Sequence, residues 1–247
     1  MTVRRAPVQR LASGETALDA ATSRYLARVL RLDIDEVFVA FDPRAGREAD
    51  ARIVRIEDGV VVANMGALRE AKIVAARSVT LVQGLAKGEK CDAIVRDATE
   101  LGATEIIFVA TERSVVQLDG ARAIERVKRW SKIASEAARQ SGRGEAPAIS
   151  ISSWSETIEA ESHEAKRFVL DPHANAPLAP LMLELCETDH AVVFAVGPEG
   201  GFAPSELEMA EKQAWKRVRF GRTTLRTETA TAAFLGALRA LEDLFGT

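Results

Sequence analysis

Short apolar runs alternate with amphipathic segments from Ser78 onward, and this pattern predicts strands and helices in turn. Apolar and β-branched runs predict strands at 79–83, 105–109, 148–151, 167–170, 191–196 and 217–220. Helical spacing of apolar positions predicts helices at 88–102, 121–140 and 229–245, with a further helical-looking segment after Pro204. Strands that are apolar on both faces and alternate with helices are typical of an α/β domain. We therefore expect a mostly parallel sheet covered by helices.

The first 70 residues have a different pattern, with short β-branched runs separated by turn residues. Strands are predicted at 37–41, 51–56 and 60–63, and turns at Asp42-Pro43, Gly46 and Asp58-Gly59. A short helix is predicted before them, at 23–32, with Leu26, Val29 and Leu30 on one face. This part of the chain is expected to be a small β-rich unit.

A domain boundary is expected where the pattern weakens, at 66–76. This divides the chain into a small domain at 1–70 and an α/β domain at 75–247. A chain of 247 residues is long enough for both to bury a core.

Composition restricts the class of protein. An aromatic fraction of 5% within 47% hydrophobic residues suits an ordinary α/β protein with an aliphatic core. No apolar run approaches the roughly 20 residues that span a bilayer, and the first residues lack a signal-peptide pattern. The two cysteines offer no disulfide framework, and together with the three histidines they lack metal-ligand spacing. We expect a cytoplasmic protein without a membrane segment or a metal.

The net charge of −3 conceals an uneven distribution. Lysine and arginine dominate 121–143 and 212–226, whereas 144–211 is acidic. Three arginines also recur at helical spacing on the polar side of the predicted helix at 23–32. Separate basic patches can bind phosphate although the total charge is negative. Solvated helix and strand faces are the simpler explanation of any single patch.

One glycine-rich stretch, Gly197-Pro198-Glu199-Gly200-Gly201-Phe202, follows a predicted strand and precedes a helical-looking segment. Such a connection lets backbone approach a ligand, because proline restricts φ and glycine adopts conformations closed to other residues. The stretch matches neither the dinucleotide-binding fingerprint, which follows the first strand of its unit, nor the Walker A pattern. On its own it is equally consistent with a tight connection that binds nothing.

A second stretch, Leu225-Arg226-Thr227-Glu228-Thr229-Ala230, changes this interpretation. Together the two stretches resemble the SPOUT methyltransferases and, within them, the RsmE family. Shorter segments that agree with the family pattern are Arg28-Val29-Leu30-Arg31, Glu100-Leu101-Gly102, Glu112-Arg113-Ser114, Trp130-Ser131-Lys132-Ile133-Ala134 and Gln140-Ser141-Gly142-Arg143. The resemblance implies an enzyme that uses S-adenosylmethionine to methylate N3 of a uridine in 16S ribosomal RNA.

The resemblance also implies an architecture and partners. It predicts a PUA-like β-barrel that binds RNA at 1–70 and a SPOUT domain at 75–247 with a carboxyl-terminal trefoil knot. It further implies a homodimer that acts on 16S rRNA or the small ribosomal subunit. Periodicity indicates no knot, and protein chains rarely thread loops. One departure is Tyr25, where the family often has histidine, and it concerns RNA contacts.

Individual roles also follow from the resemblance. The cofactor pocket is expected to be lined by Leu170, Gly197, Pro198, Glu199, Gly200, Gly201, Leu225, Arg226, Thr227, Glu228 and Ala230. RNA contacts are expected from Arg4, Arg10, Arg24, Arg28, Arg31, Arg139, Gln140 and Arg143. For Thr227 and Thr229, N-capping of the last helix is a compatible interpretation.

The chemistry leaves several catalytic residues open. Uridine N3 carries a proton at neutral pH, so either a base or a cation that stabilises the uridinate is needed. Glu199 and Glu228 are possible bases, and Arg143 and Arg226 are possible charge stabilisers. Of these, Arg143, Arg226 and Glu199 are the predicted catalytic residues.

Two functions of other classes compete with this one. A non-catalytic RNA-binding ribosome-assembly factor would keep the barrel and the basic helix, and its RNA binding would depend steeply on salt. Such a protein need not keep the glycines. A metabolic nucleotide-dependent enzyme would leave the basic helix and the arginines of the small domain unexplained.

Overall fold

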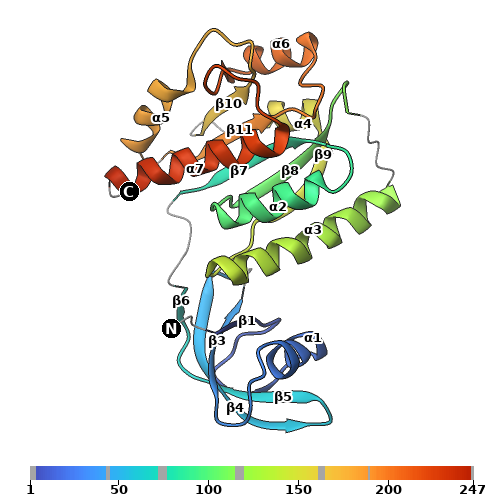
Figure 1. The fold of residues 1–247 in the computed structure, drawn as a ribbon, viewed down its shortest axis with the longest axis vertical. Helices are drawn as coiled ribbons and strands as arrows, with labels where there is room; N and C mark the ends of the chain where they lie inside the picture. The colour runs from blue at the N-terminus through green and yellow to red at the C-terminus, as the bar shows by residue number, and fades with distance from the viewer. Residues whose placement is uncertain are drawn as a thin grey trace. The chain divides into compact units, whose positions relative to one another are not determined.

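The computed structural model describes residues 4–42, 45–71, 77–114, 120–160, 165–188 and 190–245. The chain forms two units, one of Met1–Val74 with Ser135–Ala146 and one of Ala75–Ala134 with Pro147–Thr247 (Figure 1). The predicted boundary between 70 and 75 lies largely in 72–76, outside the described residues. Grouping of 135–146 with the first unit was not anticipated, and the predicted domain limits stay a prediction.

The first unit is built on one mixed sheet. Its strands are β1 (Arg5–Pro7), β2 (Gly14–Ala17), β3 (Val37–Asp42), β4 (Arg47–Glu57), β5 (Val60–Met65) and β6 (Arg69–Glu70). They follow the order β1-β3-β4-β5-β2, with β6 beside β4, and only the described pair β1–β3 is parallel. Asp58 and Gly59 both have positive φ, 49° and 79°, which is the geometry of a two-residue hairpin turn. The predicted turn between β4 and β5 is confirmed.

The helical segment of this unit differs from its prediction. It consists of α1 (Ala20–Arg24) followed by one π-helical turn, η1 (Tyr25–Val29), instead of a helix at 23–32. The wider turn, with a hydrogen bond from Leu30 N to Tyr25 O at 3.0 Å, rotates the later residues about the axis. Leu26 is buried as expected, but Val29 is 65% exposed, so its predicted place on the buried face was wrong.

The second unit is an α/β layered domain. Its strands are β7 (Val79–Gly84), β8 (Glu105–Ala110), β9 (Ala148–Ser153), β10 (Lys166–Leu170), β11 (Val192–Val196) and β12 (Lys216–Val218). In its described residues they are all parallel, in the order β12-β10-β11-β7-β8-β9. The prediction of a mostly parallel sheet is confirmed, whereas the knot stays a prediction.

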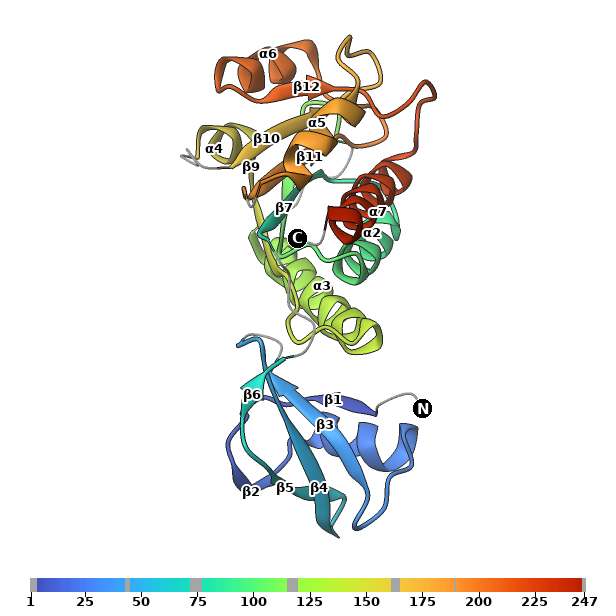
Figure 2. The same ribbon diagram turned by 90° about the vertical axis from the view of Figure 1, so that its left-hand side faces the viewer.

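Helices cover both faces of this sheet (Figure 2). They are α2 (Lys90–Glu100), α3 (Gly120–Ser141), α4 (Trp154–Glu159), α5 (Leu178–Cys186), α6 (Pro204–Lys212) and α7 (Thr227–Phe245). The end of α3 from Ser135 belongs to the first unit. No distinct prediction was made for α4 or α5, which are short. No helix among the described residues is long and apolar enough to cross a lipid bilayer.

Strand alternation sends neighbouring side chains to opposite faces of β11. Phe194 stacks on Phe234 of α7, with ring centroids 4.0 Å apart. Ala195 joins the cluster on the other face, where Trp154 of α4 packs against Phe202 at 4.5 Å. Because both faces are packed, β11 ends at a fixed position, and the residues after Val196 emerge at a defined edge of the sheet.

Candidate functional site

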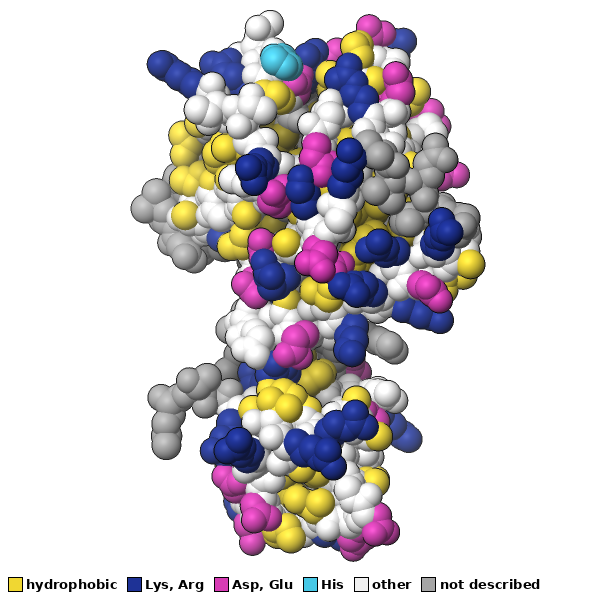
Figure 3. All heavy atoms as spheres, turned by 45° about the vertical axis from the view of Figure 1, so that its right-hand side comes forward, with side chains coloured by type: hydrophobic (Ala, Val, Ile, Leu, Met, Phe, Trp, Pro, Cys, Tyr) yellow, Lys and Arg dark blue, Asp and Glu magenta, His cyan; other side chains and the backbone are white. Residues whose placement is uncertain are grey.

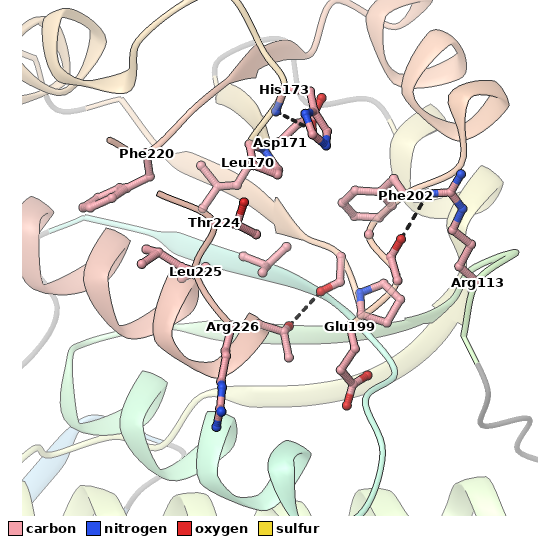
Figure 4. A pocket seen from close by; sticks show the side chains of 18 of the residues that line it. Arg113, Leu170, Asp171, His173, Glu199, Phe202, Phe220, Thr224, Leu225 and Arg226 are labelled. Carbon is pink, nitrogen blue, oxygen red and sulfur yellow. Dashed lines mark hydrogen bonds between the residues drawn. The ribbon is translucent and has the colours of Figure 1, made fainter. Parts of the chain in front are cut away.

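A cavity of about 740 Å³ lies at the carboxyl ends of β10 and β11 and beside the start of α7. Most of its lining comes from three chain segments, at 170–173, 196–202 and 223–227, and the rest from Lys90, Arg113, Leu207, Phe220 and Ala230. Ligands of open parallel sheets bind at this edge, because the connections there leave a crevice. In Figure 4 the side chains of Leu170, Phe220 and Leu225 lie together on one side, while Arg226 and Glu199 extend from another.

The first wall is the predicted glycine-rich stretch, and its shape depends on residues that lack a Cβ. A Cβ on Gly84, the last residue of β7, would lie 2.4 Å from Cδ of Pro198. A Cβ on Gly197 would lie 3.0 Å from the backbone of Gly201. Gly201 has a φ of +68° and donates its N–H to Pro198 O at 2.8 Å. The stretch is a turn folded tightly on itself and on β7.

Gly200 contacts a residue that the site prediction did not include. A Cβ at this position would lie 3.1 Å from Cβ of Arg113. The Arg113 guanidinium donates a hydrogen bond to Gly200 O at 3.1 Å, as the dashed line in Figure 4 shows. Close packing against Arg113 therefore explains this glycine. The only sequence signal for Arg113 was its place in a family-like segment after β8.

The second wall joins the first through Thr227, the first residue of α7. Its hydroxyl donates to Gly197 O at 2.7 Å and accepts a hydrogen bond from Gln83 Nε2 at 2.8 Å. The N-capping interpretation of Thr227 and Thr229 was wrong, because α7 begins at Thr227 and this hydroxyl is used between segments. The two motif stretches are thus linked directly.

Gln83 is a buried polar residue that the sequence interpretation missed. Its amide nitrogen also donates to Gly84 O at 3.0 Å, and its amide oxygen accepts from Thr231 Oγ1 at 3.0 Å. One side chain thereby connects β7 to two turns of α7. A glutamine within an apolar strand was the available signal, since buried polar groups require partners.

Glu199 is exposed, and its carboxylate is anchored by α2 and the loop before that helix. Its Oε1 accepts from Lys90 Nζ at 2.7 Å and from the Lys87 amide at 3.2 Å. Burial alone would raise the pKa of Glu199, but these hydrogen bonds outweigh it and lower the pKa. A carboxylate with a lowered pKa is a weaker proton acceptor.

Of the predicted residues Arg226 and Glu228, one lines the cavity and the other does not. Arg226 lines the cavity and is exposed. Glu228 is the predicted cofactor residue that does not line it, although one of its carboxylate oxygens is buried with no hydrogen-bond partner among the described residues. Leu170, Leu225 and Ala230 line the cavity as expected.

The sequence interpretation also missed the segment that follows β10. Asp171 and His173 line the cavity, and the His173 amide donates to Asp171 Oδ1 at 3.0 Å (Figure 4). The other carboxylate oxygen of Asp171 is paired with Arg217 of β12. This arginine, part of the basic stretch at 212–226, therefore stabilises the strand edge.

The arginines predicted to contact RNA are in the first unit, and five of them are exposed: Arg4, Arg10, Arg24, Arg28 and Arg31. Val29 is 65% exposed. On the face that Figure 3 shows, apolar side chains lie among the basic side chains of this unit. Arg4 is exposed but paired with Glu36 at 2.6 Å.

The predicted RNA residues at the end of α3 are mostly engaged within the protein. The Arg139 guanidinium lies 4.3 Å from the ring centroid of Tyr25, donates to the Tyr25 hydroxyl and pairs with Glu136. Arg143 is 3% exposed and lies 3.5 Å from Glu145. Gln140 is exposed. Arg143 belongs to the first unit, and this predicted catalytic residue is not among the residues that line the cavity.

Metal chemistry has no visible site in the described part of the chain. No group of three or more His, Cys, Asp or Glu side chains there is arranged to hold a metal ion.

The fold and the cavity together define a class of protein: an α/β domain with a small-molecule pocket, preceded by a small β domain. A model of the RNA methyltransferase domain matches residues 75–239, and a model of the RNA methyltransferase PUA domain matches residues 18–63. The chain belongs to this RNA methyltransferase family.

Two relatives named ribosomal RNA small subunit methyltransferase E are similar to this chain. The Mycobacterium bovis protein is 35% identical over 166 residues, which cover 66% of this chain and 63% of that protein. The Bacillus subtilis protein is 32% identical over 171 residues, which cover 67% of each. The matched part thus spans less than two thirds of the first relative's length.

A solved structure is similar over almost the whole chain. It is the crystal structure of ribosomal RNA small subunit methyltransferase E from Neisseria gonorrhoeae bound to S-adenosyl methionine. Its sequence is 28% identical, the TM-score is 0.87, and the match covers 97% of this chain and 98% of that one.

Proposed function

We propose that this protein uses S-adenosylmethionine to methylate N3 of a uridine in the 16S ribosomal RNA of the small subunit. The observation that carries the proposal is the Thr227–Gly197 hydrogen bond, which joins the two motif stretches around one cavity. Family membership and the named relatives support the reaction class.

The cavity fits the cofactor in size and chemistry. Its volume of about 740 Å³ is within the range of small-molecule sites. Leu170, Phe220 and Leu225 offer an apolar surface for a flat purine ring, and the turn at 197–202 exposes backbone groups to a ligand. Both motif stretches, with Leu170, would hold the cofactor. When bound, it supplies an electrophilic methyl group on a sulfonium.

The protein's own task is to position two substrates and manage one proton. Holding both reactants in line removes most of the entropic barrier. Arg226 at the cavity edge is suited to stabilise negative charge on the target base. Glu199, with its lowered pKa, is suited to hold the turn against α2. The role of Arg143 is proposed to be on the RNA side.

RNA binding is assigned to the first unit. Arg10, Arg24, Arg28 and Arg31 present exposed guanidinium groups, which suit phosphate contacts. The small domain matches a PUA domain of RNA methyltransferases, which supports the same assignment. The target would be 16S rRNA or the small ribosomal subunit, in the cytoplasm.

A homodimer is part of the proposal. Between α5 and α7 lies an apolar hollow of about 310 Å³, lined by residues that include Leu178, Leu183, Phe220 and Leu241. Leu183 is 47% exposed, and a second copy would cover it. Light scattering should give the dimer mass, and Leu183→Asp should shift it toward the monomer.

The reaction is tested by two measurements. Isothermal titration should detect S-adenosylmethionine binding, and no binding would contradict the enzyme assignment. Mass spectrometry of ribosomal RNA nucleosides should show loss of 3-methyluridine in cells lacking the protein, restored by the wild-type gene. Cofactor binding without this loss would contradict the target. The competing role of a non-catalytic assembly factor predicts RNA binding but no change in nucleosides.

A further inference from the structure

Lys90, at the first position of α2, lines the cavity and was not among the predicted site residues. Its side chain is 36% exposed, so a ligand entering from solvent can reach it. Its Nζ donates to Glu199 at 2.7 Å. An ammonium has three N–H donors, and Glu199 takes the one bond found for it among the described residues.

The charges around Lys90 keep it cationic. Glu199 faces it from the glycine-rich turn, and Glu228 and Arg226 face it from the start of α7. The hydrogen bond with Glu199 is the main effect and raises the pKa of Lys90; burial and Arg226 oppose it. Since the pKa of Glu199 is lowered and that of Lys90 is raised, the carboxylate stays ionised and the ammonium stays protonated near neutral pH.

The proposed reaction requires a group of this kind. Breaking the N3–H bond of a uridine leaves the electron pair on N3 and shares its negative charge with the two flanking carbonyl oxygens. The proton passes to a solvent water, because Lys90 and Glu199 keep their charged forms. A fixed cation at the position where charge develops lowers the barrier to transfer.

Arg113 and Asp171, which also line the cavity, are less available for this task. The Arg113 guanidinium donates to Gly200 O. Asp171 is paired with Arg217 and is negative. Arg226 is exposed and lies near Lys90, so the two cations share one end of the cavity.

We propose that Lys90 is a catalytic residue that donates a hydrogen bond to a carbonyl oxygen of the target uridine and stabilises its anionic form. Glu199 is a positioning residue, which holds the ammonium at the cavity edge. This inference rests on the proposed methylation and adds the group that activates the methyl acceptor.

The first test compares Lys90→Met and Lys90→Arg by single-turnover methylation across pH. Lys90→Met should slow transfer by about 100-fold near neutral pH while cofactor affinity is kept. The defect should shrink as pH rises, because the uridine then ionises without help. Lys90→Arg keeps the cation and should retain most activity. The matched control is Lys87→Met, which removes an exposed charge whose side chain does not line the cavity and leaves the backbone amide in place.

The second test needs no cofactor. RNA fragments carrying uridine or 5-fluorouridine at the target position differ mainly in the acidity of N3. The wild-type protein should bind the fluorinated RNA more tightly in a fluorescence anisotropy titration, increasingly so at higher pH. Lys90→Met should lose this preference, and Lys87→Met should keep it.

Distinct outcomes separate the inference from the proposed function. A wild-type protein that neither binds S-adenosylmethionine nor methylates RNA refutes the proposed function. An active wild type with a pH-independent defect in both Lys90 variants, or with cofactor affinity lost in parallel, makes Lys90 an anchor of the turn and overturns the inference. So does an equal preference for fluorinated RNA in wild type and Lys90→Met.

Discussion

The two units differ in how well the sequence predicted the positions of their functional residues. In the second unit, ten of the eleven predicted cofactor residues line one cavity, with Glu228 the exception. In the first, the predicted RNA residues divide between exposed side chains, such as Arg28, and buried ones, such as Arg139 and Arg143. Glycine and proline motifs report where the chain must approach itself closely. A pattern of arginines predicts where positive charge lies along the chain. It does not predict whether RNA, solvent or another side chain of the protein pairs with that charge.

The physical basis of this difference is the range of the forces involved. The absence of a Cβ affects packing only against atoms within van der Waals distance. At Gly84 those atoms belong to Pro198, which leaves no room for a Cβ. A guanidinium has five donors on a long stem and can turn to solvent, a carboxylate or an aromatic ring. Arg139 uses a ring, that of Tyr25, and only the folded structure shows it.

The largest effect is expected from Gly84→Ala. The added Cβ would lie 2.4 Å from Pro198 Cδ and 2.6 Å from Pro198 N, so backbone must move. Overpacking of this kind costs about 3 kcal/mol, and the displaced turn should weaken cofactor binding in titration calorimetry by about 100-fold. The control is Gly236→Ala in α7, which meets nothing within 4 Å and should stabilise the helix. Wild-type affinity in Gly84→Ala would show that the turn does not form the pocket.

A smaller loss is expected from Gln83→Leu. It leaves the Thr231 hydroxyl without its side-chain acceptor and removes the donor to Thr227, inside the core. We expect urea denaturation to show a loss of about 2 kcal/mol. Thr231→Val, which removes one of these hydrogen bonds, should lose about 1 kcal/mol. Equal stability of Gln83→Leu and wild type would mean that the link between the motif stretches does not depend on this amide.

In the first unit, Arg28→Ala and Arg139→Ala should separate exposed from engaged arginines. Arg28→Ala should weaken RNA binding by about 1 kcal/mol and reduce the slope of log affinity against log salt by about one. Arg139→Ala should instead lower thermal stability, because it removes the ion pair with Glu136 and the contact with the Tyr25 ring. Anisotropy titrations at several salt concentrations measure the RNA affinity and salt slope of both variants, and thermal denaturation measures their stability. A larger change of slope in Arg139→Ala would reverse the assignment.

The smallest effect concerns the cap of α1. Burial raises the pKa of Asp19, but hydrogen bonds from Thr22 and Ala21 outweigh it and lower the pKa. A lowered folded-state pKa gives stability that is present above the unfolded pKa and is lost as pH falls below it. Asp19→Asn should therefore flatten the loss of stability in acid, while Asp19→Ala costs about 1 kcal/mol at neutral pH. An unchanged acid transition in Asp19→Asn would contradict this.

Much of the fold could be predicted from the sequence. The parallel sheet, the position of α3, the Asp58-Gly59 hairpin and the two stretches around the cavity all followed from periodicity, turn chemistry or resemblance. The π-helical turn at Tyr25–Val29 did not, because helical spacing of apolar residues assumes 3.6 residues per turn.

What the sequence alone determined is local: which runs form strands and where glycine and proline permit a sharp turn. Such preferences act over a few residues and leave a pattern along the chain. Only the tertiary structure decided which side chains meet across it, with separations of 144 residues between Gln83 and Thr227, 109 between Lys90 and Glu199, and 87 between Arg113 and Gly200. These contacts complete the cavity. No local sequence pattern predicts these contacts, because each joins two segments that are far apart in the chain and that the sheet brings to the same edge.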